Sequence, residues 1–332
     1  VVLDTAADWQ WWINGWQYVL DAAQVTGSDV CLMAFSFGPF IGFWSAFDAA
    51  VQRGCLTIPA GGFRSAARLE QIQTLGVTCL FCTPSYALHL GEVAEKEGVD
   101  PRRSTVRCLI LAGEPGGSLP SVRRRIEETW DASVLDHSGA TEVGPWGYGN
   151  LDEPGLHVNE AEFIAEFLAV DSGLPAGEGE LAELILTTLG RRGAPVIRYR
   201  TGDRVRPIWH HDRPLRFVWL EGGLLGRADD MMIIRGMNVF PSSVECILRE
   251  FPGIVEYRMT ASTKAGMDQL RIEIEDQQDD PRRVAERLQL RLGLRVEVRT
   301  VPQGSLPRFE GKGKRFIDQR LWTNDDGSTH NN

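Results

Sequence analysis

The sequence predicts a two-part α/β protein, with a large domain built on a mostly parallel sheet and a smaller α+β domain after it. The first observation is the alternation of short apolar runs with longer helical segments over residues 1–136, which is typical of β-α-β units and a parallel sheet. The second is a β-α-β-β-α-β order beyond residue 226. The third is a length of 332 residues with 43% apolar residues, which suits about two well-packed domains.

The large domain is predicted from its apolar runs and the segments between them. Expected strands cover 30–34, 55–59, 77–83, 106–112 and 132–136, and expected helices cover 8–23, 43–53, 66–74, 85–97 and 119–130. From Phe163 to Tyr199, short strands between Gly/Pro turns indicate a small antiparallel or barrel-like subdomain. Open parallel sheets bind ligands at the carboxyl ends of their strands. Two predicted loops at such ends, 112–117 and 137–147, therefore become the first candidates for a site.

The small domain is predicted from strands at 231–234, 254–261, 269–276 and 295–301 and helices at 243–249 and 281–292. This order is that of a ferredoxin-like body. The resulting boundaries are a large domain over 1–226, a small domain over 227–321 and a frayed polar tail over 322–332.

Charge and composition exclude some classes of function. The net charge is −10, with 18 Lys+Arg against 28 Asp+Glu before Gly226 and 17 against 17 from there onward. A nucleic-acid interface would need a basic face, so that class is excluded. No apolar run is long enough for a membrane-spanning helix, and no charged-then-apolar leader is found, so no signal peptide is expected. The six scattered cysteines favour a reduced, cytoplasmic protein.

Two local patterns have competing interpretations. Cys79-Leu80-Phe81-Cys82 is a CxxC, which suits either a metal or redox pair or a buried strand, and the apolar neighbours favour the strand. Asp136-His137-Ser138 has the letters of a hydrolase triad. Neighbouring side chains on a strand point to opposite faces, and no GxSxG turn is present, so this interpretation is rejected.

The stretch 225–245, LGRADDMMIIRGMNVFPSSVE, joins the two predicted domains. It closely resembles the hinge of the adenylate-forming enzymes, in the form carried by phenylacetate–CoA ligases. Three further motifs resemble the same family in order along the chain: AGEP at 112–115, SGATE at 138–142 and YRTGD at 199–203. A fourth, LPRFEGKGKR at 306–315, is similar to the family's C-terminal lysine motif.

The resemblance implies a nucleotide site that takes ATP and AMP. Thr141 would contact the α-phosphate, and Glu142 would hold Mg²⁺, a cation that prefers carboxylate oxygen. Asp203 would accept hydrogen bonds from the ribose hydroxyls. The remaining nucleotide contacts implied by the resemblance are Gly113, Glu114 and Pro115 against adenine, Ser138 and Gly139 in the SGATE segment, and Arg227 near the ribose and phosphate. Ser138 departs from the family, which usually has a tyrosine stacked on adenine at this position.

The resemblance also implies a second step on the same site. Lys312 would be the catalytic lysine that stabilises the meeting of carboxylate and α-phosphate. Asp229 would be the pivot about which the small domain turns, and Arg235 and Gly236 would line the channel for CoA. The family's Ser/Thr/Gly-rich phosphate loop does not occur within residues 1–332. We therefore expect this chain, which begins on Val1 without methionine, to be truncated at its N-terminus and inactive with ATP alone.

The resulting expectation is an AMP-forming carboxylate–CoA ligase for an aromatic, phenylacetate-like acid. Phe35, Phe37 and Phe40 near a strand end suit either an acid pocket, with Ala140, or plain core. Two alternatives stay open: an adenylation enzyme that loads a carrier protein, and a non-catalytic nucleotide- or acyl-binding relative. The expected partners are the acid and CoA, with neither nucleic acid nor membrane, and a homodimer is possible.

Overall fold

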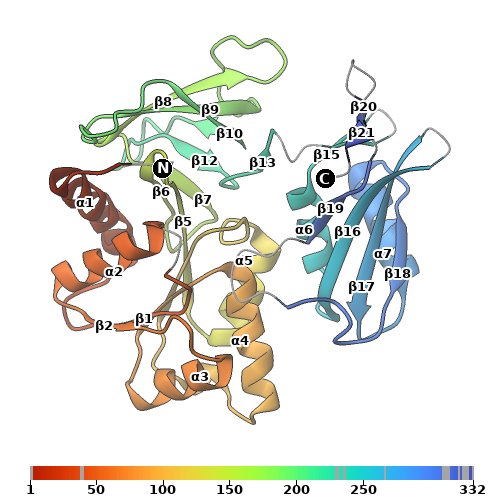
Figure 1. Cartoon of the computed structure of the whole chain (residues 1–332), viewed down its shortest axis with the longest axis horizontal. Helices are drawn as coiled ribbons and strands as arrows, with labels where there is room; N and C mark the ends of the chain where they lie inside the picture. Colours follow the sequence, from red (N-terminus) through yellow and green to blue (C-terminus); the bar gives the residue numbers. More distant parts are fainter. Residues whose placement is uncertain are drawn as a thin grey trace. The chain divides into compact units, whose positions relative to one another are not determined.

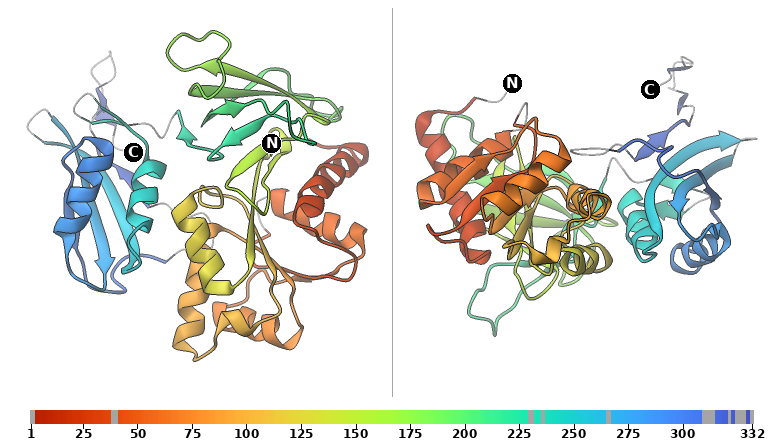
Figure 2. Two further views of the ribbon diagram at one scale, coloured as in Figure 1. Left: turned by 180° about the vertical axis from the view of Figure 1, so that it is seen from behind. Right: turned by 90° about the horizontal axis from the view of Figure 1, so that it is seen from below.

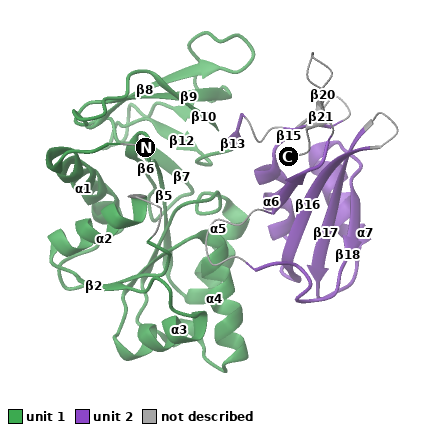
Figure 3. Ribbon diagram, in the orientation of Figure 1, with its two compact units in different colours: residues 1–225 green, residues 226–332 purple. Residues whose placement is uncertain are grey.

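The computed structural model describes residues 3–37, 41–228, 232–234, 237–264, 267–308, 315–320, 322–323 and 329–330 of the 332. Contacts divide the chain into two compact units, Val1–Leu225 and Gly226–Asn332 (Figure 3). No helix among the described residues is long and apolar enough to cross a membrane.

Unit 1 alternates strands and helices and then continues in strands. Its helices are α1 (Ala6–Ala22), α2 (Ile41–Arg53), α3 (Ser65–Thr74), α4 (Pro84–Lys96), the short 3₁₀ helix η1 (Pro101–Arg103) and α5 (Pro120–Trp130). Its strands are β1 (Val30–Met33), β2 (Leu56–Pro59), β3 (Cys79–Cys82), β4 (Cys108–Leu111), β5 (Ser133–Ala140), β6 (Gly144–Tyr148), β7 (Gly155–Val158), β8 (Phe163–Ala169), β9 (Ala182–Thr188), β10 (Tyr199–Val205), β11 (Pro207–Ile208) and β12 (Trp219–Glu221).

The main sheet of unit 1 is mixed. Nine strands follow the order β11-β12-β7-β6-β5-β4-β3-β1-β2. The half from β2 to β5 is parallel, as the β-α-β pattern predicts. From β5 onward every pairing is antiparallel, through β6, β7, β12 and β11. The sheet therefore changes direction at β5, whose two neighbours run in opposite senses.

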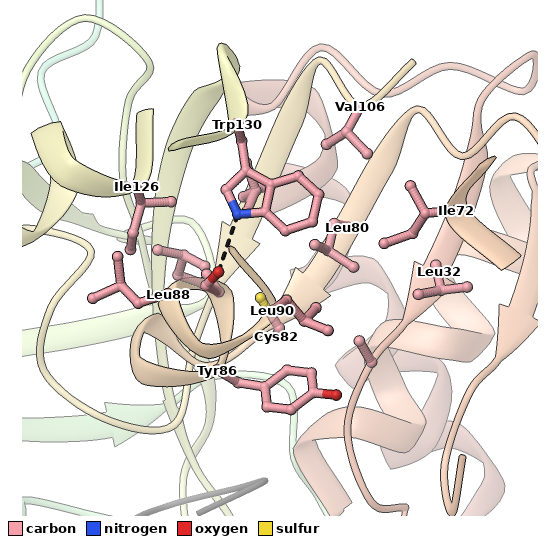
Figure 4. Packing of buried hydrophobic residues seen from close by; sticks show 14 of the residues in the cluster. Leu32, Ile72, Leu80, Cys82, Tyr86, Leu88, Leu90, Val106, Ile126 and Trp130 are labelled. Carbon is pink, nitrogen blue, oxygen red and sulfur yellow. Dashed lines mark hydrogen bonds between the residues drawn. The ribbon is translucent and has the colours of Figure 1, made fainter. Parts of the chain in front are cut away.

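Two hydrophobic cores form on the two faces of the parallel half. On one face Leu80 and Leu109 pack with residues of α3, α4 and α5, and Trp130 donates its indole N–H to the carbonyl of Ala87 at 3.1 Å (Figure 4). The other face is covered by α1 and α2 (Figure 1), and there Cys31 and Ile110 pack with residues of these two helices. Strands buried on both faces read as continuous apolar runs, which is why β3 and β4 could be located from the sequence.

The CxxC of β3 illustrates the alternation of a strand. Cys79 belongs to the core under α1 and α2, whereas Cys82 belongs to the core under α3, α4 and α5. Residues three apart on a strand point to opposite faces. Both side chains are buried, and the six cysteines are free thiols. The pair is therefore part of the packing, as the strand interpretation predicts.

A second sheet closes unit 1. Strand β9 pairs antiparallel with both β8 and β10. A third core lies between this sheet and the antiparallel strands of the main sheet, and it includes Trp11, Trp12, Trp146 and Phe163. The tryptophans of α1 are thus structural: Trp11 and Trp16 also donate their indole N–H groups to Glu162 Oε2 and Ser45 Oγ, at 2.5 and 2.8 Å.

Unit 2 is a small α+β body with its own core. Its elements are β13 (Gly226–Arg227), β14 (Met232–Ile234), β15 (Met237–Val239), α6 (Pro241–Arg249), β16 (Ile254–Lys264), β17 (Met267–Asp276), α7 (Pro281–Leu292), β18 (Glu297–Thr300), β19 (Phe316–Asp318), β20 (Trp322–Thr323) and β21 (Thr329–His330). Helices α6 and α7 lie along the sheet that contains β16 and β17 (Figure 2), and apolar residues of these four elements pack together. The α+β class expected for this region is confirmed.

The strand order of unit 2 differs from the expectation in one respect. The four-stranded sheet has the order β18-β17-β16-β19. The first strand, predicted over 231–234, is described over Met232–Ile234, and it pairs instead with Met237–Val239 in a separate two-stranded sheet. Strand β17 pairs directly with β18 in parallel, and β19 adds to the other edge of the sheet, where it pairs parallel with β16. Phe316–Asp318 is only three residues long, and too short a segment to show a strand period in the sequence.

Candidate active site

The two segments predicted to bind a ligand lie at the carboxyl ends of the adjacent parallel strands β4 and β5, and the carboxyl end of β3 lies next to that of β4. After β3, Thr83 Oγ1 accepts a hydrogen bond from the backbone N–H of Tyr86 and caps α4. After β4, the carboxylate of Glu114 accepts a hydrogen bond from the backbone N–H of Ser85 at 2.7 Å. A carboxylate is favoured at a helix N-terminus. The side chain of Glu114 therefore stabilises the N-terminus of α4. Thr83 also lies at this end of the sheet, and the sequence analysis did not predict it as a site residue.

The loop after β4 depends on glycine. Gly113 and Gly116 have φ of +94° and +152°, a region that other residues rarely adopt. A Cβ at Gly116 would lie 2.5 Å from the Cβ of Pro84, and one at Gly117 would lie 2.5 Å from Oδ1 of Asp136. The backbone of this loop is thus pressed against α4 and β5. This close approach holds the loop in place. Because its glycines have no side chains to cover the backbone, the backbone groups of the loop can contact a ligand.

The segment 137–147 is a hairpin, so the prediction of a loop there was wrong. Strand β5 runs on to Ala140, and β6 begins at Gly144, with Ser138 opposite Gly147. Thr141 and Glu142 occupy the turn, and both are exposed. The glycines in this stretch concealed the strand, because glycine is rare in strand interiors. The hairpin gives Thr141 and Glu142 a rigid support that a loop would not.

Asp136 and His137 point away from each other, as expected for neighbours on a strand. Asp136 is buried and accepts a hydrogen bond from Ser118 Oγ at 2.5 Å. The His137 ring is buried on the other side, 4.1 Å from the Trp16 ring between centroids, with Nδ1 at 2.7 Å from the carbonyl oxygen of Gly147. Neither residue meets Ser138 as a triad would require. Both are structural supports of β5.

Burial shifts the pKa values of Asp136 and His137 in opposite directions. It raises the pKa of the Asp136 carboxyl to about 7, although the hydrogen bond from Ser118 opposes the shift. It lowers the pKa of the His137 imidazole to about 4, against the hydrogen bond with Gly147. In both cases the charged form is disfavoured because it loses water. The folded strand therefore prefers a protonated Asp136 and a neutral His137.

The YRTGD segment lies on β10, and Asp203 stands on an irregularity of the strand. The pairing register with β9 shifts between Arg200 and Arg204, and Gly202 has φ of +76°. Thr201 Oγ1 donates to the carbonyl oxygen of Leu184 at 2.9 Å and accepts from the backbone N–H of Asp203 at 3.0 Å. A bulge re-aims the side chain that follows it. Gly202 inside a strand pattern was the available signal for this bulge.

Aromatic side chains gather beside the β4 loop. Phe35 stacks on Phe43 with ring centroids 3.7 Å apart, and Phe37 contacts Trp44 and Phe47 at 4.8 and 5.7 Å. A Cβ at Gly113 would lie 3.7 Å from Cζ of Phe43. Phe43 therefore borders the loop, whereas Phe35 is 3% exposed and belongs to the core under α1 and α2. Phe43 was missed because it lies in the helical pattern of α2. Ala140, in contrast, packs against the third core with Trp11 and Phe163.

The remaining predicted residues fall in or near unit 2. Arg227 is exposed at the end of β13. Four predicted residues, together with Phe40 of unit 1, lie outside the described residues: Asp229, Arg235, Gly236 and Lys312. The residues that flank 309–314 are held by ion pairs. Arg308 binds Glu275 at 2.7 Å, and Arg315 binds Glu256 at 2.7 Å. These pairs tie both ends of the lysine motif to β17 and β16.

Comparison with known proteins identifies the family. Residues 236–320 match the family model of the AMP-binding enzyme C-terminal domain. The phenylacetate-coenzyme A ligase of Escherichia coli is 31% identical over 325 residues, which cover 93% of this chain and 73% of that protein. This chain belongs to the phenylacetate–CoA ligase family of adenylate-forming enzymes. The phenylacetate-coenzyme A ligase of Pseudomonas putida is 29% identical over 97% of the chain and 75% of its own length.

A solved structure extends this family relationship to three dimensions. A 2-hydroxyisobutyryl-CoA ligase, crystallised in the postadenylation state in complex with 2-HIB-AMP, superposes with a TM-score of 0.89. Its sequence is 28% identical, and the match covers 95% of this chain and 70% of that one. The adenylate-forming fold expected from the motifs is thereby confirmed.

The protonation states of Asp136 and His137 predict how stability depends on pH. The raised pKa of Asp136 contributes stability that is complete below about pH 4 and is lost as pH rises to about 7. The depressed pKa of His137 contributes stability that is complete above about pH 6.5 and is lost as pH falls towards 4. Asp136→Asn keeps a neutral acceptor for Ser118 and removes only the first dependence.

We therefore expect the unfolding free energy of Asp136→Asn, minus that of the wild type, to rise between about pH 4 and 7 by on the order of a few kcal/mol. Denaturant unfolding at intervals from pH 4 to 8 measures this difference, in which the contribution of His137 cancels. A difference that stays constant across the range would show that Asp136 has an ordinary pKa.

Proposed function

We propose that this chain belongs to an enzyme that transfers an acyl group through an acyl-adenylate, with an aromatic, phenylacetate-like acid as the substrate and CoA as the acceptor. In the first half-reaction a carboxylate oxygen attacks the α-phosphorus of ATP, and pyrophosphate leaves. In the second the CoA thiol attacks the acyl carbon, and AMP leaves together with a proton. The observation that carries the proposal is the similarity to phenylacetate–CoA ligases over nearly the whole chain. The site motifs lie on the strand ends and turn described above.

The residues of unit 1 suit the nucleotide. Glu142 is an exposed carboxylate on a rigid turn, and a carboxylate of this kind would hold Mg²⁺ and thereby offset phosphate charge. Thr141 beside it offers a hydroxyl to the α-phosphate. Asp203, which lies on the bulge of β10, would accept hydrogen bonds from the ribose hydroxyls. Gly113 and Pro115 would contact adenine through the loop backbone, which compensates for the absence of a ring at Ser138.

The aromatic cluster supports the choice of acid. Phe43 borders Gly113 and is partly exposed, as is Phe37, while the buried Phe35 packs against both rings from the core. Aromatic rings favour offset or edge contacts with other rings. A phenylacetyl group suits such a wall better than a short hydroxy acid does.

The six free thiols are compatible with a reducing compartment, and the cytoplasm is therefore proposed as the location of the protein.

The proposal is tested with supplied acyl-adenylates, because these bypass the triphosphate. Purified chain is incubated with CoA and either phenylacetyl-adenylate or 2-hydroxyisobutyryl-adenylate, and thioester and AMP are quantified by chromatography. We expect thioester formation well above the uncatalysed rate, and faster with the phenylacetyl compound. Preference for the hydroxyacyl compound would contradict the acid class. Binding of the adenylate without transfer to CoA would favour a carrier-protein acceptor or a non-catalytic relative, and adding a carrier protein separates these two.

Lys312 is proposed to act only where carboxylate meets phosphate, because the second half-reaction has no such meeting of anions. Lys312→Ala is expected to leave thioester formation from supplied acyl-adenylate nearly unchanged. In a form of the protein that also carries the family's phosphate loop, it should slow the formation of acyl-adenylate from acid and ATP by about a hundredfold or more. Lys314→Ala serves as the matched control. Equal loss of both activities in a folded variant would contradict this role.

Asp203 is predicted to recognise the ribose. Replacing it with alanine removes a hydrogen bond to the 2′-hydroxyl, so the Kd of AMP should rise by about tenfold. The Kd of 2′-deoxy-AMP should change much less, so that the variant no longer distinguishes the two. Calorimetric titration measures both, with the exposed Asp171→Ala as the control. A variant that keeps the wild-type preference for AMP would rule out this contact.

A further inference from the structure

The turn that carries Thr141 and Glu142 is held from beneath by a buried arginine. Inside the turn the backbone N–H of Val143 donates to the carbonyl oxygen of Ala140 at 3.1 Å. The carbonyl oxygens of Thr141 and Glu142 both accept hydrogen bonds from Nη1 of Arg191, at 3.1 and 2.6 Å. The side chains of these two turn residues stay exposed while their backbone is tied down.

Arg191 is itself fully constrained. It is 2% exposed, and its Nε and Nη2 donate to the two carboxylate oxygens of Asp4 at 2.7 and 2.8 Å. Its guanidinium lies over the Trp12 ring, 5.4 Å from the centroid. One planar group thus makes four hydrogen bonds in two directions. Lysine could not reproduce this arrangement, because its ammonium is a point charge without the fork geometry.

The loop that presents Arg191 is anchored to the start of α1. The carboxylate of Asp8 accepts the backbone N–H groups of Arg192 and Gly193 at 2.6 and 3.0 Å. The same carboxylate closes the N-terminal cap of α1 with Thr5, and these hydrogen bonds, those from Thr5 foremost, hold the pKa of Asp8 well below its ordinary value. A Cβ at Gly190 would lie 2.1 Å from Trp11. The position of Arg191 is therefore set by contacts on both sides.

We propose that Arg191, oriented by Asp4, is a positioning residue for the nucleotide phosphate and its Mg²⁺. It fixes the backbone of Thr141 and Glu142 so that their side chains are already placed when the ligand arrives. Hydrogen bonds made by charged groups are among the stronger ones in proteins, and a site whose ordering precedes binding loses less affinity to ordering. The inference rests on the proposed function, because the roles of Thr141 and Glu142 come from it.

A merely structural role for Arg191 would give a different result. Loss of a structural contact would weaken the binding of every ligand equally or leave binding unchanged. Loss of positioning weakens only the ligands that carry a phosphate. AMP and adenosine differ by that group alone, so the ratio of their Kd values in the presence of Mg²⁺ reports the positioning directly.

The test compares Arg191→Lys with Asp4→Asn, and uses Arg198→Lys as the matched control. Arg198 pairs with Glu166 at the surface, with 62% of its side chain exposed. Calorimetry gives the Kd of AMP and of adenosine with Mg²⁺, and hydrogen exchange follows the amides of 140–143. For Arg191→Lys we expect about a tenfold or greater loss of AMP affinity, little change for adenosine and faster exchange of the Val143 amide. Asp4→Asn is the milder change, and it should have the same effects on the Kd of AMP, the Kd of adenosine and the exchange rate of the Val143 amide, but smaller ones.

The outcomes separate the inference from the function on which it rests. A wild type that does not bind AMP more tightly than adenosine would overturn both. A wild type that does so, with an Arg191→Lys variant that loses AMP and adenosine equally, or that exchanges faster at Val143 yet binds AMP normally, would overturn the positioning role alone. If Arg191→Lys does not fold, Asp4→Asn decides by the same ratio.

Discussion

The geometry of unit 1 depends on the double role of β5. This strand pairs in parallel with β4 on one side and antiparallel with β6 on the other. It is buried from Val134 to His137, and its two faces belong to the two different cores. The parallel pairing brings its carboxyl end level with that of β4. The antiparallel pairing lets the chain turn back at Thr141 and Glu142. The turn is therefore carried by a strand that cannot shift without disturbing both cores.

Hydrogen bonds and ion pairs between charged groups then hold the turn that the sheet positions. Asp8 and Asp4 connect the N-terminus of α1 to a loop nearly two hundred residues later, and Arg191 passes that constraint to the turn. In unit 2 the pairs Arg308–Glu275 and Arg315–Glu256 do the same for the ends of the lysine motif. An ion pair with most of its charge buried is costly to break from one side. Such pairs suit segments that must keep their place while ligands come and go.

Much of the fold could be predicted because the local patterns were strong. The buried strands β3 and β4 read as unbroken apolar runs, and α7 was predicted with the bounds that the structure gives. The β5–β6 hairpin was missed because its glycines resemble a loop. The short β19 was missed because three residues show no period. In the candidate site the motif residues could be named by resemblance, whereas Arg191 could not, because its partners lie 49 to 187 positions away. Phe43 was missed for a related reason: helical periodicity does not reveal which strand-end residue the helix faces.

In the proposed function, the nucleotide binds over the loop after β4, the turn after β5 and the bulge of β10. Hydrogen exchange with and without a non-hydrolysable phenylacetyl-adenylate tests this claim most directly, because it reads backbone protection at all three places in one experiment. The account predicts slower exchange in residues 113–117, 139–143 and 201–203 when the ligand is bound. Protection confined to other segments, with these three exchanging at their unliganded rates, would contradict it.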